Sequence, residues 1–257
     1  MKAMHPSRQQ VALVTGAAKR IGRIIALALA RDGWDIAVHY GKSRTEALQL
    51  VKEITALGRR AIALQCELAD ESGVKSLIAQ AAQLGPVRCI VNNASLFEHD
   101  LAENFSTTSL DRHMHANLAA PVLLAQSLFE ATPAGQQSVV VNLLDQKLYN
   151  PNPDFLSYTL SKAALLSATT LLAQALAPKV RVVGVAPGIT MVSGDQTPDQ
   201  FEQAHQVTPL GKSSTPDDVA AAVCFAATAA AMTGTTILVD GGQHLIPLQR
   251  DVMFIAK

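Results

Sequence analysis

Residues 11–22 read Val11-Ala12-Leu13-Val14-Thr15-Gly16-Ala17-Ala18-Lys19-Arg20-Ile21-Gly22. The apolar run at 11–14 predicts a strand, and an apolar helix follows after a turn that Gly16 allows. A strand, a glycine turn and a helix in this order are typical of dinucleotide-binding folds, because the amides at the start of the helix face a pyrophosphate. Arg20 occupies the middle position of the common three-glycine pattern, so a long cationic side chain replaces close backbone approach there.

The rest of the chain continues this alternation of strands and helices. Apolar runs predict strands at 11–14, 35–39, 60–65, 89–91, 138–143, 181–185 and 236–239. Helix-like runs lie at 20–32, 44–57, 71–84, 110–132, 158–177 and 216–228. Seven strands separated by helices predict an α/β fold with a doubly wound, Rossmann-type parallel sheet flanked by helices. We expect the 257 residues to form this single domain and no second one.

The composition favours a small-molecule partner. Lys plus Arg and Asp plus Glu both number 21, so there is no basic field to attract nucleic acid or an anionic membrane. No apolar run approaches the ~20 residues of a membrane span, and residues 1–10 lack the apolar core of a signal peptide. These features predict a cytoplasmic protein.

Cysteine and histidine spacing argues against a metal site. Cys66, Cys89 and Cys224 are odd in number and far apart, which implies neither a disulfide framework nor a zinc cluster. His113 and His115 stand two residues apart on a predicted helix and therefore point to different faces.

Tyr158 and Lys162 are the best clue to chemistry. Their four-residue spacing in a predicted helix places both polar heads on one face. A free phenol titrates near ~10, so a Tyr that exchanges a proton near neutral pH needs a cation beside it, and Lys162 can supply one.

Two adjacent amides end the predicted strand at 89–91. Asn92 and Asn93 are followed by Ala94 and Ser95. Amide side chains at a strand end can bind a ribose, and a strand-capping turn fits the same residues equally well.

Together these segments resemble the short-chain dehydrogenase/reductase family from about Gln10 to Gly242. The resemblance is carried by Thr15-Gly16 with Gly22, Asn92-Asn93-Ala94, Tyr158 with Lys162, and Ala186-Pro187-Gly188. Within the family the chain is most similar to pteridine reductases, through residues 15–22, His39-Tyr40-Gly41-Lys42-Ser43, Asn92-Asn93-Ala94-Ser95-Leu96-Phe97 and Asn142-Leu143-Leu144-Asp145. Most short-chain reductases have a catalytic serine where this chain, like the pteridine reductases, has Asp145.

The resemblance implies an NADPH-dependent reductase of dihydropterins or folates and gives roles to individual residues. Tyr158 donates or relays the proton, Lys162 holds the nicotinamide ribose, Asn117 supports a water relay, and Asp145 binds the pterin and assists protonation. The substrate-binding residues are Arg20, Ser95, Phe97, Asp145 and Tyr158, and Phe97 stacks on a flat heterocycle. The cofactor-binding residues are Gly16, Lys19, Arg20, Ile21, Gly22, His39, Tyr40, Lys42, Ser43, Glu67, Leu68, Asn93, Ala94, Ser95, Tyr158, Lys162, Pro187, Gly188 and Ile189.

The cofactor is expected to be NADPH rather than NADH. NAD sites of this type carry an acid about 20 residues after the glycine turn, and that acid would repel a 2′-phosphate. No acid occurs in this chain between His39 and Glu46, whereas Lys42, Ser43 and Arg20 offer donors to a phosphate.

Two segments lie outside the regular pattern. Residues 189–214 show no clear periodicity and follow a strand end, so we expect a mobile substrate lid there, with a plain surface loop as the alternative. The apolar tail at 243–257 is expected to pack, and the family is commonly tetrameric, which predicts a homotetramer.

Two other functions stay open. A carbonyl reductase acting on a 3-oxoacyl thioester or another ketone would use the same Tyr158 and Lys162, and the missing serine argues against it. A non-catalytic NADP-binding sensor would keep the pocket, and the intact set of Tyr158, Lys162 and Asn117 argues against that.

Overall fold

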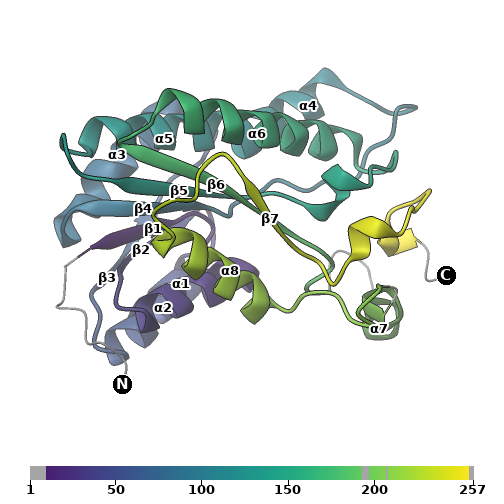
Figure 1. Ribbon diagram of the computed structural model, residues 1–257, viewed down its shortest axis with the longest axis horizontal. Helices are drawn as coiled ribbons and strands as arrows, with labels where there is room; N and C mark the ends of the chain where they lie inside the picture. Colours follow the sequence, from purple (N-terminus) through teal and green to yellow (C-terminus); the bar gives the residue numbers. More distant parts are fainter. Residues whose placement is uncertain (1–9, 193–196, 207, 255–257) are drawn as a thin grey trace.

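Seven parallel strands form one sheet at the centre of the computed structural model, which describes residues 10–192, 197–206 and 208–254 (Figure 1). The strand order is β3-β2-β1-β4-β5-β6-β7. The strands are β1 (Val11–Val14), β2 (Asp35–Tyr40), β3 (Ala61–Gln65), β4 (Val87–Asn92), β5 (Ser138–Leu143), β6 (Val180–Pro187) and β7 (Thr236–Val239). The predicted doubly wound sheet is confirmed.

Helices cover both faces of the sheet, as Figure 1 shows. One face carries α1 (Arg20–Arg31), α2 (Arg44–Ala56) and α8 (Pro216–Thr228). The other carries α3 (Glu71–Ala81), α4 (Thr107–Met114), α5 (Ala120–Ala131) and α6 (Leu156–Ala175). Because both faces are buried, the central strands are apolar throughout: Ala12 and Val14 pack toward α1, whereas Val11 and Leu13 pack toward α3 and α5.

The strand order reverses between β1 and β4. The chain runs outward from β1 through β2 to β3, and then returns to place β4 on the other side of β1. Open α/β sheets bind ligands outside the carboxyl ends of the strands at such a point. The segments that follow β1 and β4 therefore meet where a ligand is expected.

The structure departs from the sequence prediction in two helical regions. The helix expected at 110–132 begins at Thr107, where Ser106 Oγ accepts from Ser109 N at 3.2 Å, and a π-helical turn (His115–Ala119) separates α4 from α5. The aperiodic stretch 189–214 contains a helix, α7 (Pro198–Gln206), while 193–196 and 207 lie outside the described residues. Few of the α7 residues are apolar, so periodicity gave no signal there.

Helix α7 and the C-terminal segment lie side by side at one end of the molecule (Figure 1). A short 3₁₀ turn (Val252–Phe254) of that segment contacts α7. Two more 3₁₀ turns, Gln146–Tyr149 and Gln243–Leu245, pack against each other after β5 and β7. Among the described residues, no helix has the length and apolar character needed to cross a membrane.

Candidate active site

The ends of β1 and β4 are joined by side-chain hydrogen bonds. Thr15 Oγ1 accepts from the backbone amides of Asn93 and Ala94, each at 3.0 Å, and Asn93 Nδ2 donates to the carbonyl oxygens of Thr15 (2.9 Å) and Gly16 (3.3 Å). A Cβ on Gly22 would lie 2.4 Å from Gly16 O and 2.5 Å from Asn93 Nδ2. Only glycine therefore lets α1 approach this junction.

The start of α1 is built to face an anion. Its N-cap, Lys19, makes no side-chain capping bond, and the first turn contains no acidic residue. Arg20 has a φ of 53°, the left-handed region that the missing glycine of the motif would adopt at lower cost. Uncapped helix amides next to two cationic side chains fit the pyrophosphate of a dinucleotide.

His39 holds the glycine loop in place by hydrogen bonds of its imidazole ring. Its Nδ1 accepts from Gly16 N at 3.1 Å, so Nε2 carries the proton and donates to Cys66 O at 3.1 Å. Burial lowers the pKa of this imidazole to about 4. His39 is thus neutral and fully bonded, and its ring positions the loop without lining the cavity.

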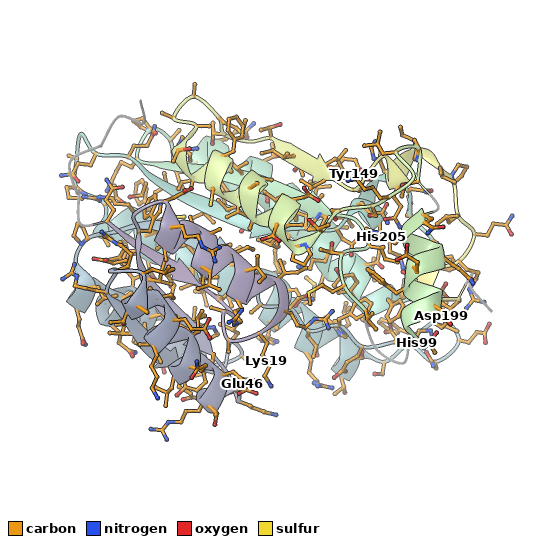
Figure 2. The ribbon with its side chains drawn as sticks, turned by 90° about the horizontal axis from the view of Figure 1, so that it is seen from below. Lys19, Glu46, His99, Tyr149, Asp199 and His205 are labelled. Atoms are coloured by element: carbon orange, nitrogen blue, oxygen red, sulfur yellow. The ribbon has the colours of Figure 1, made fainter. Side chains whose placement is uncertain are left out.

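The other residues expected at the adenosine end lie around the start of α2. Lys19 Nζ pairs with Glu46 Oε1 at 2.6 Å across the gap between α1 and α2, as Figure 2 shows. Ser43 is the N-cap of α2 and makes no side-chain capping bond. The remaining positions expected there flank this region: Tyr40 is buried, Lys42 precedes the cap, Glu67 faces Gly41, and Leu68 packs against the core.

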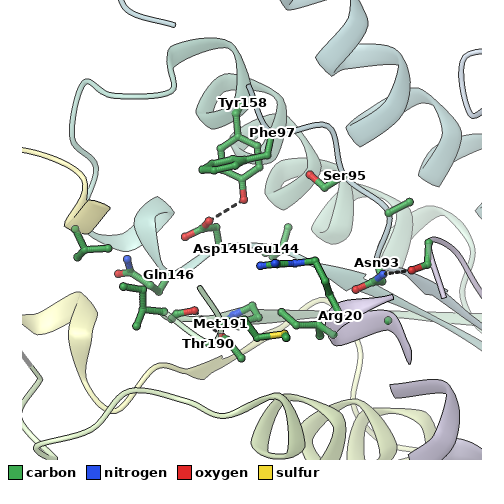
Figure 3. Close-up of a pocket in the computed structure, with 18 of the residues that line it drawn as sticks. Arg20, Asn93, Ser95, Phe97, Leu144, Asp145, Gln146, Tyr158, Thr190 and Met191 are labelled. Carbon is green, nitrogen blue, oxygen red and sulfur yellow. Dashed lines mark hydrogen bonds between the residues drawn. The ribbon is translucent and has the colours of Figure 1, made fainter. Parts of the chain in front are cut away.

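A cavity of about 490 Å³ opens at the switch point (Figure 3). Expected site residues that line it are Gly16, Lys19, Arg20, Ile21, Gly22, Asn93, Ala94, Ser95, Phe97, Asp145, Tyr158, Pro187, Gly188 and Ile189. Arg20 extends from the glycine loop toward Asp145, and its Nη1 donates to Val192 O at 2.9 Å. The loop and the first residues of the expected lid are therefore connected.

Tyr158 and Asp145 form a buried hydrogen-bonded pair. Tyr158 Oη donates to Asp145 Oδ2 at 2.7 Å, and Asp145 Oδ1 accepts from Lys147 N at 2.8 Å. Burial raises the pKa of Asp145, and burial followed by the Asp145 carboxyl raises the pKa of Tyr158 well above 10. The buried carboxyl of Asp145 thus binds its proton more tightly than a free one, and Tyr158 keeps its proton.

Lys162 lies behind this pair. Its Nζ donates to Leu143 O at 2.7 Å and sits 5.8 Å from the centre of the Tyr158 ring. Burial lowers the pKa of Lys162 to about 8. The lower pKa of Tyr158 expected from a neighbouring cation is not found, because burial, and then the Asp145 carboxyl that contacts the phenol oxygen, raise this pKa.

Asn117 occupies the π-helical turn between α4 and α5. Its Nδ2 donates to Leu96 O (3.0 Å) and Ser161 Oγ (2.9 Å), and its Oδ1 accepts from Leu96 N (2.7 Å) and Ser95 Oγ (3.3 Å). An amide has two donors and two acceptor positions, so these four bonds use the whole side chain. Its role here is to hold the segment after β4 beside α6.

Phe97 is part of an aromatic stack at the mouth of the cavity. It stacks on Phe155 with ring centres 4.2 Å apart and meets the Tyr158 ring edge-on at 4.7 Å. Its side chain stays 40% exposed, so part of its surface remains open to a ligand.

The cavity also contains residues that the sequence did not single out. Gln146, Gln243, Asp251 and Val252 line it, and Lys147 is buried beside it. Gln146 and Lys147 have one local signal, their position directly after Asp145. Gln243, Asp251 and Val252 lie about 100 residues further along the chain, and no short motif links them to the site.

Comparison with known proteins agrees with this geometry. A family model described as short chain dehydrogenase matches residues 10–203. The chain belongs to this family. It is therefore an oxidoreductase, and the alternative of a non-catalytic sensor is set aside.

Three relatives each align with more than nine tenths of the chain. The chain is 32% identical to a 3-oxoacyl-[acyl-carrier-protein] reductase, FabG, of Staphylococcus epidermidis, over 91% of this chain and 98% of the relative. Its sequence is 40% identical to that of FolM alternative dihydrofolate reductase 1 from Brucella canis, whose crystal structure was solved in complex with NADP. The two structures align with a TM-score of 0.89 over 95% of this chain and 97% of the other. A blue fluorescent protein from a metagenomic library, in complex with NADPH, is 32% identical with a TM-score of 0.83 over 93% and 99%.

Proposed function

We propose that this short-chain dehydrogenase reduces dihydropterin or folate-type substrates with NADPH. The observation that carries the proposal is the Asp145 carboxyl, buried in the cavity 2.7 Å from the Tyr158 hydroxyl. Pterins present N–H donors next to basic ring nitrogens. A carboxyl group can accept from the former and, when protonated, donate to the latter.

NADPH is the proposed cofactor, and when bound it supplies the hydride. The uncapped start of α1, with Lys19 and Arg20, would hold its phosphates. Lys162 would bind the nicotinamide ribose from behind Tyr158. Two observations support this assignment: the close approach of α1 to the glycine loop that Gly22 permits, and the NADP or NADPH bound to the neighbouring structures.

Protonation of the substrate falls to the Asp145 and Tyr158 pair. Asp145, whose pKa burial raises, donates when protonated to the ring nitrogen next to the reduced carbon. The Tyr158 hydroxyl bonded to its other side stabilises the carboxylate that forms and relays a proton to it. Phe97 would cover the open face of the heterocycle, with Ser95 and Arg20 at its edges.

The competing function is reduction of a 3-oxoacyl thioester, which the name of the staphylococcal relative favours. A ketone has no N–H group for Asp145 to accept from, and whenever this carboxyl is ionised it would oppose the alkoxide that forms on hydride transfer. The lid at 189–214, a homotetrameric assembly and a cytoplasmic location stay predictions from the sequence.

The proposal is tested by NADPH oxidation with dihydrobiopterin, dihydrofolate and acetoacetyl-coenzyme A, each assayed with NADH as a parallel cofactor. We expect turnover of at least one reduced pterin or folate with NADPH and weak turnover of the thioester. Turnover of the thioester alone would contradict the proposal.

A further inference from the structure

The C-terminal strap, defined as residues 246–254, is fixed to the start of α6 by a buried carboxylate. Asp154 is fully buried and accepts from Arg250 Nε at 3.0 and 2.8 Å, through its two oxygens, and from Asp251 N at 2.7 Å. Asn150 Nδ2 also donates to Ile246 O. The strap is therefore held at several points along its length.

A buried lysine orients the Asp251 side chain. Lys147 is 3% exposed, and its Nζ donates to Asp154 O at 2.6 Å and to Asp251 Oδ2 at 3.1 Å. A buried cation holds its carboxylate partner strongly, because separating the two would leave the buried lysine without its ion-pair partner. Asp251 is thereby held at the wall of the cavity that also contains Asp145.

The strap also completes the aromatic stack. Phe254 stacks on Phe155 with ring centres 6.0 Å apart, and Phe155 stacks on Phe97. Val252, between Asp251 and Phe254 in sequence, lines the same cavity. The strap thus supplies an apolar and an acidic group to the region where the substrate of the proposed function would lie.

We propose that Asp251 is a specificity-determining residue, a second carboxylate that favours substrates with N–H donors and disfavours substrates whose reacting group develops negative charge. This inference rests on the proposed function and extends it to the strap. A 2-amino-4-oxo heterocycle offers such donors, whereas a ketone offers none. The strap therefore adds to the preference for pterins over ketones that Asp145 provides at the reacting atoms.

Several ionisable groups surround Asp145 and together with Asp251 set its pKa. Tyr158 and Lys162 face Asp145 from α6, Lys147 from the 3₁₀ turn after β5, and Asp251 from the strap, while Arg20 lines the same cavity. Burial is the largest cause that raises the pKa of Asp145, and the negative charge of Asp251 raises it further. Without that charge Asp145 would lose its proton at a lower pH. The pH above which activity declines should therefore be lower in the variant than in the wild type.

The test is Asp251→Asn, assayed for kcat and KM on dihydrobiopterin and acetoacetyl-coenzyme A across pH 5–9. The substitution keeps the size of the side chain and the backbone bond to Asp154. We expect KM for the dihydropterin to rise roughly 10–100-fold, as for a lost hydrogen bond to a charged group. We also expect a smaller preference for the pterin over the thioester, and the pH shift given above.

Two control variants separate charge from structure. Asp217→Asn makes the same charge change at the exposed start of α8. It should alter neither the preference for the pterin over the thioester nor the pH dependence of activity. Arg250→Gln loosens the strap but keeps Asp251; if it reproduces the full effect of Asp251→Asn, the strap acts by order alone and the inference is wrong. Should Asp251→Asn fold poorly by melting temperature, Asp251→Ser replaces it.

The two possible failures are distinguishable. A wild-type enzyme without pterin turnover contradicts the proposed function and the inference with it. A wild-type enzyme that reduces dihydropterin, beside an Asp251→Asn variant with the same KM, substrate preference and pH profile, overturns the inference alone.

Discussion

Two regions at the same edge of the sheet are held together by different forces. Around the glycine loop, Thr15, His39 and Asn93 are neutral and bond mainly to backbone atoms. Around the strap, Lys147 and Asp154 are charged, buried and paired with residues about 100 positions away. The first region fixes a shape for phosphates, whereas the second fixes charges around a substrate. Substitutions in the first should therefore change stability and cofactor affinity, whereas substitutions in the second should change substrate selectivity as well as stability.

The largest effect is expected at Tyr158. Tyr158→Phe removes the hydroxyl and keeps the ring, so kcat should fall by roughly 10²–10⁴-fold while the affinity for NADPH stays nearly constant. Lys162→Ala should reduce both, since Lys162 is expected to contact the ribose as well. Steady-state rates and fluorescence titration with NADPH measure the two quantities, and unchanged turnover in Tyr158→Phe would refute the mechanism.

Removal of the strap should destabilise the substrate side. A chain truncated after Pro247 loses Arg250 and Asp251, which leaves Asp154 and Lys147 buried without their charged partners. Breaking a buried pair such as Lys147 with Asp251 costs about 3–5 kcal/mol. We expect a lower melting temperature and, by light scattering, a smaller or less stable oligomer. A truncated protein with the mass and melting temperature of the full chain would show that the strap does not stabilise the fold or the oligomer.

The glycine-loop side should respond to acid. The pKa of His39 is about 4 in the folded chain against 6.5 when unfolded, so the unfolded chain binds the proton first. Stability from this group is complete above pH 6.5 and declines as the pH falls toward 4, by about 1.4 kcal/mol per pH unit and about 3 kcal/mol in all. Urea unfolding at several pH values should show this slope in the wild type and a shallower one in His39→Asn; equal slopes would remove His39 as the cause.

A smaller effect is expected at Gly22. In Gly22→Ala the new Cβ would collide with Gly16 O and Asn93 Nδ2, which costs about 1–3 kcal/mol and displaces the amides that face the phosphates. NADPH affinity should fall together with stability. Gly58→Ala is the matched control, because its site has open space and only the positive φ of 78° is strained. Retained NADPH affinity in Gly22→Ala would contradict the close approach described here.

The sequence predicted the glycine-loop region more completely than the strap region. The seven strands and the meeting of Gly16, Gly22 and Asn93 follow from local apolar runs and turn residues, which act over short distances along the chain. The helix α7 was missed because it has few apolar residues. Lys147 and Asp251 were missed because their pairing depends on where the tail folds back, which no local pattern encodes.

Asp145 was recognised from the family resemblance, but its environment was not. The sequence suggested that Lys162 would lower the pKa of Tyr158, whereas the structure places the carboxyl on the phenol oxygen and raises that pKa. Burial decides this outcome, and the burial of one side chain depends on elements distant in sequence.

The most direct test compares wild type and Asp145→Ser on dihydrobiopterin and on acetoacetyl-coenzyme A, with NADPH as the reductant. If the carboxyl is the proton donor to a nitrogen heterocycle, the serine variant should lose roughly 10²–10⁴-fold in pterin turnover and keep or gain activity on the thioester. NADPH affinity, measured alongside, should not change. Pterin turnover that is unaffected by the substitution, or a wild-type enzyme that reduces only the thioester, would contradict the central claim.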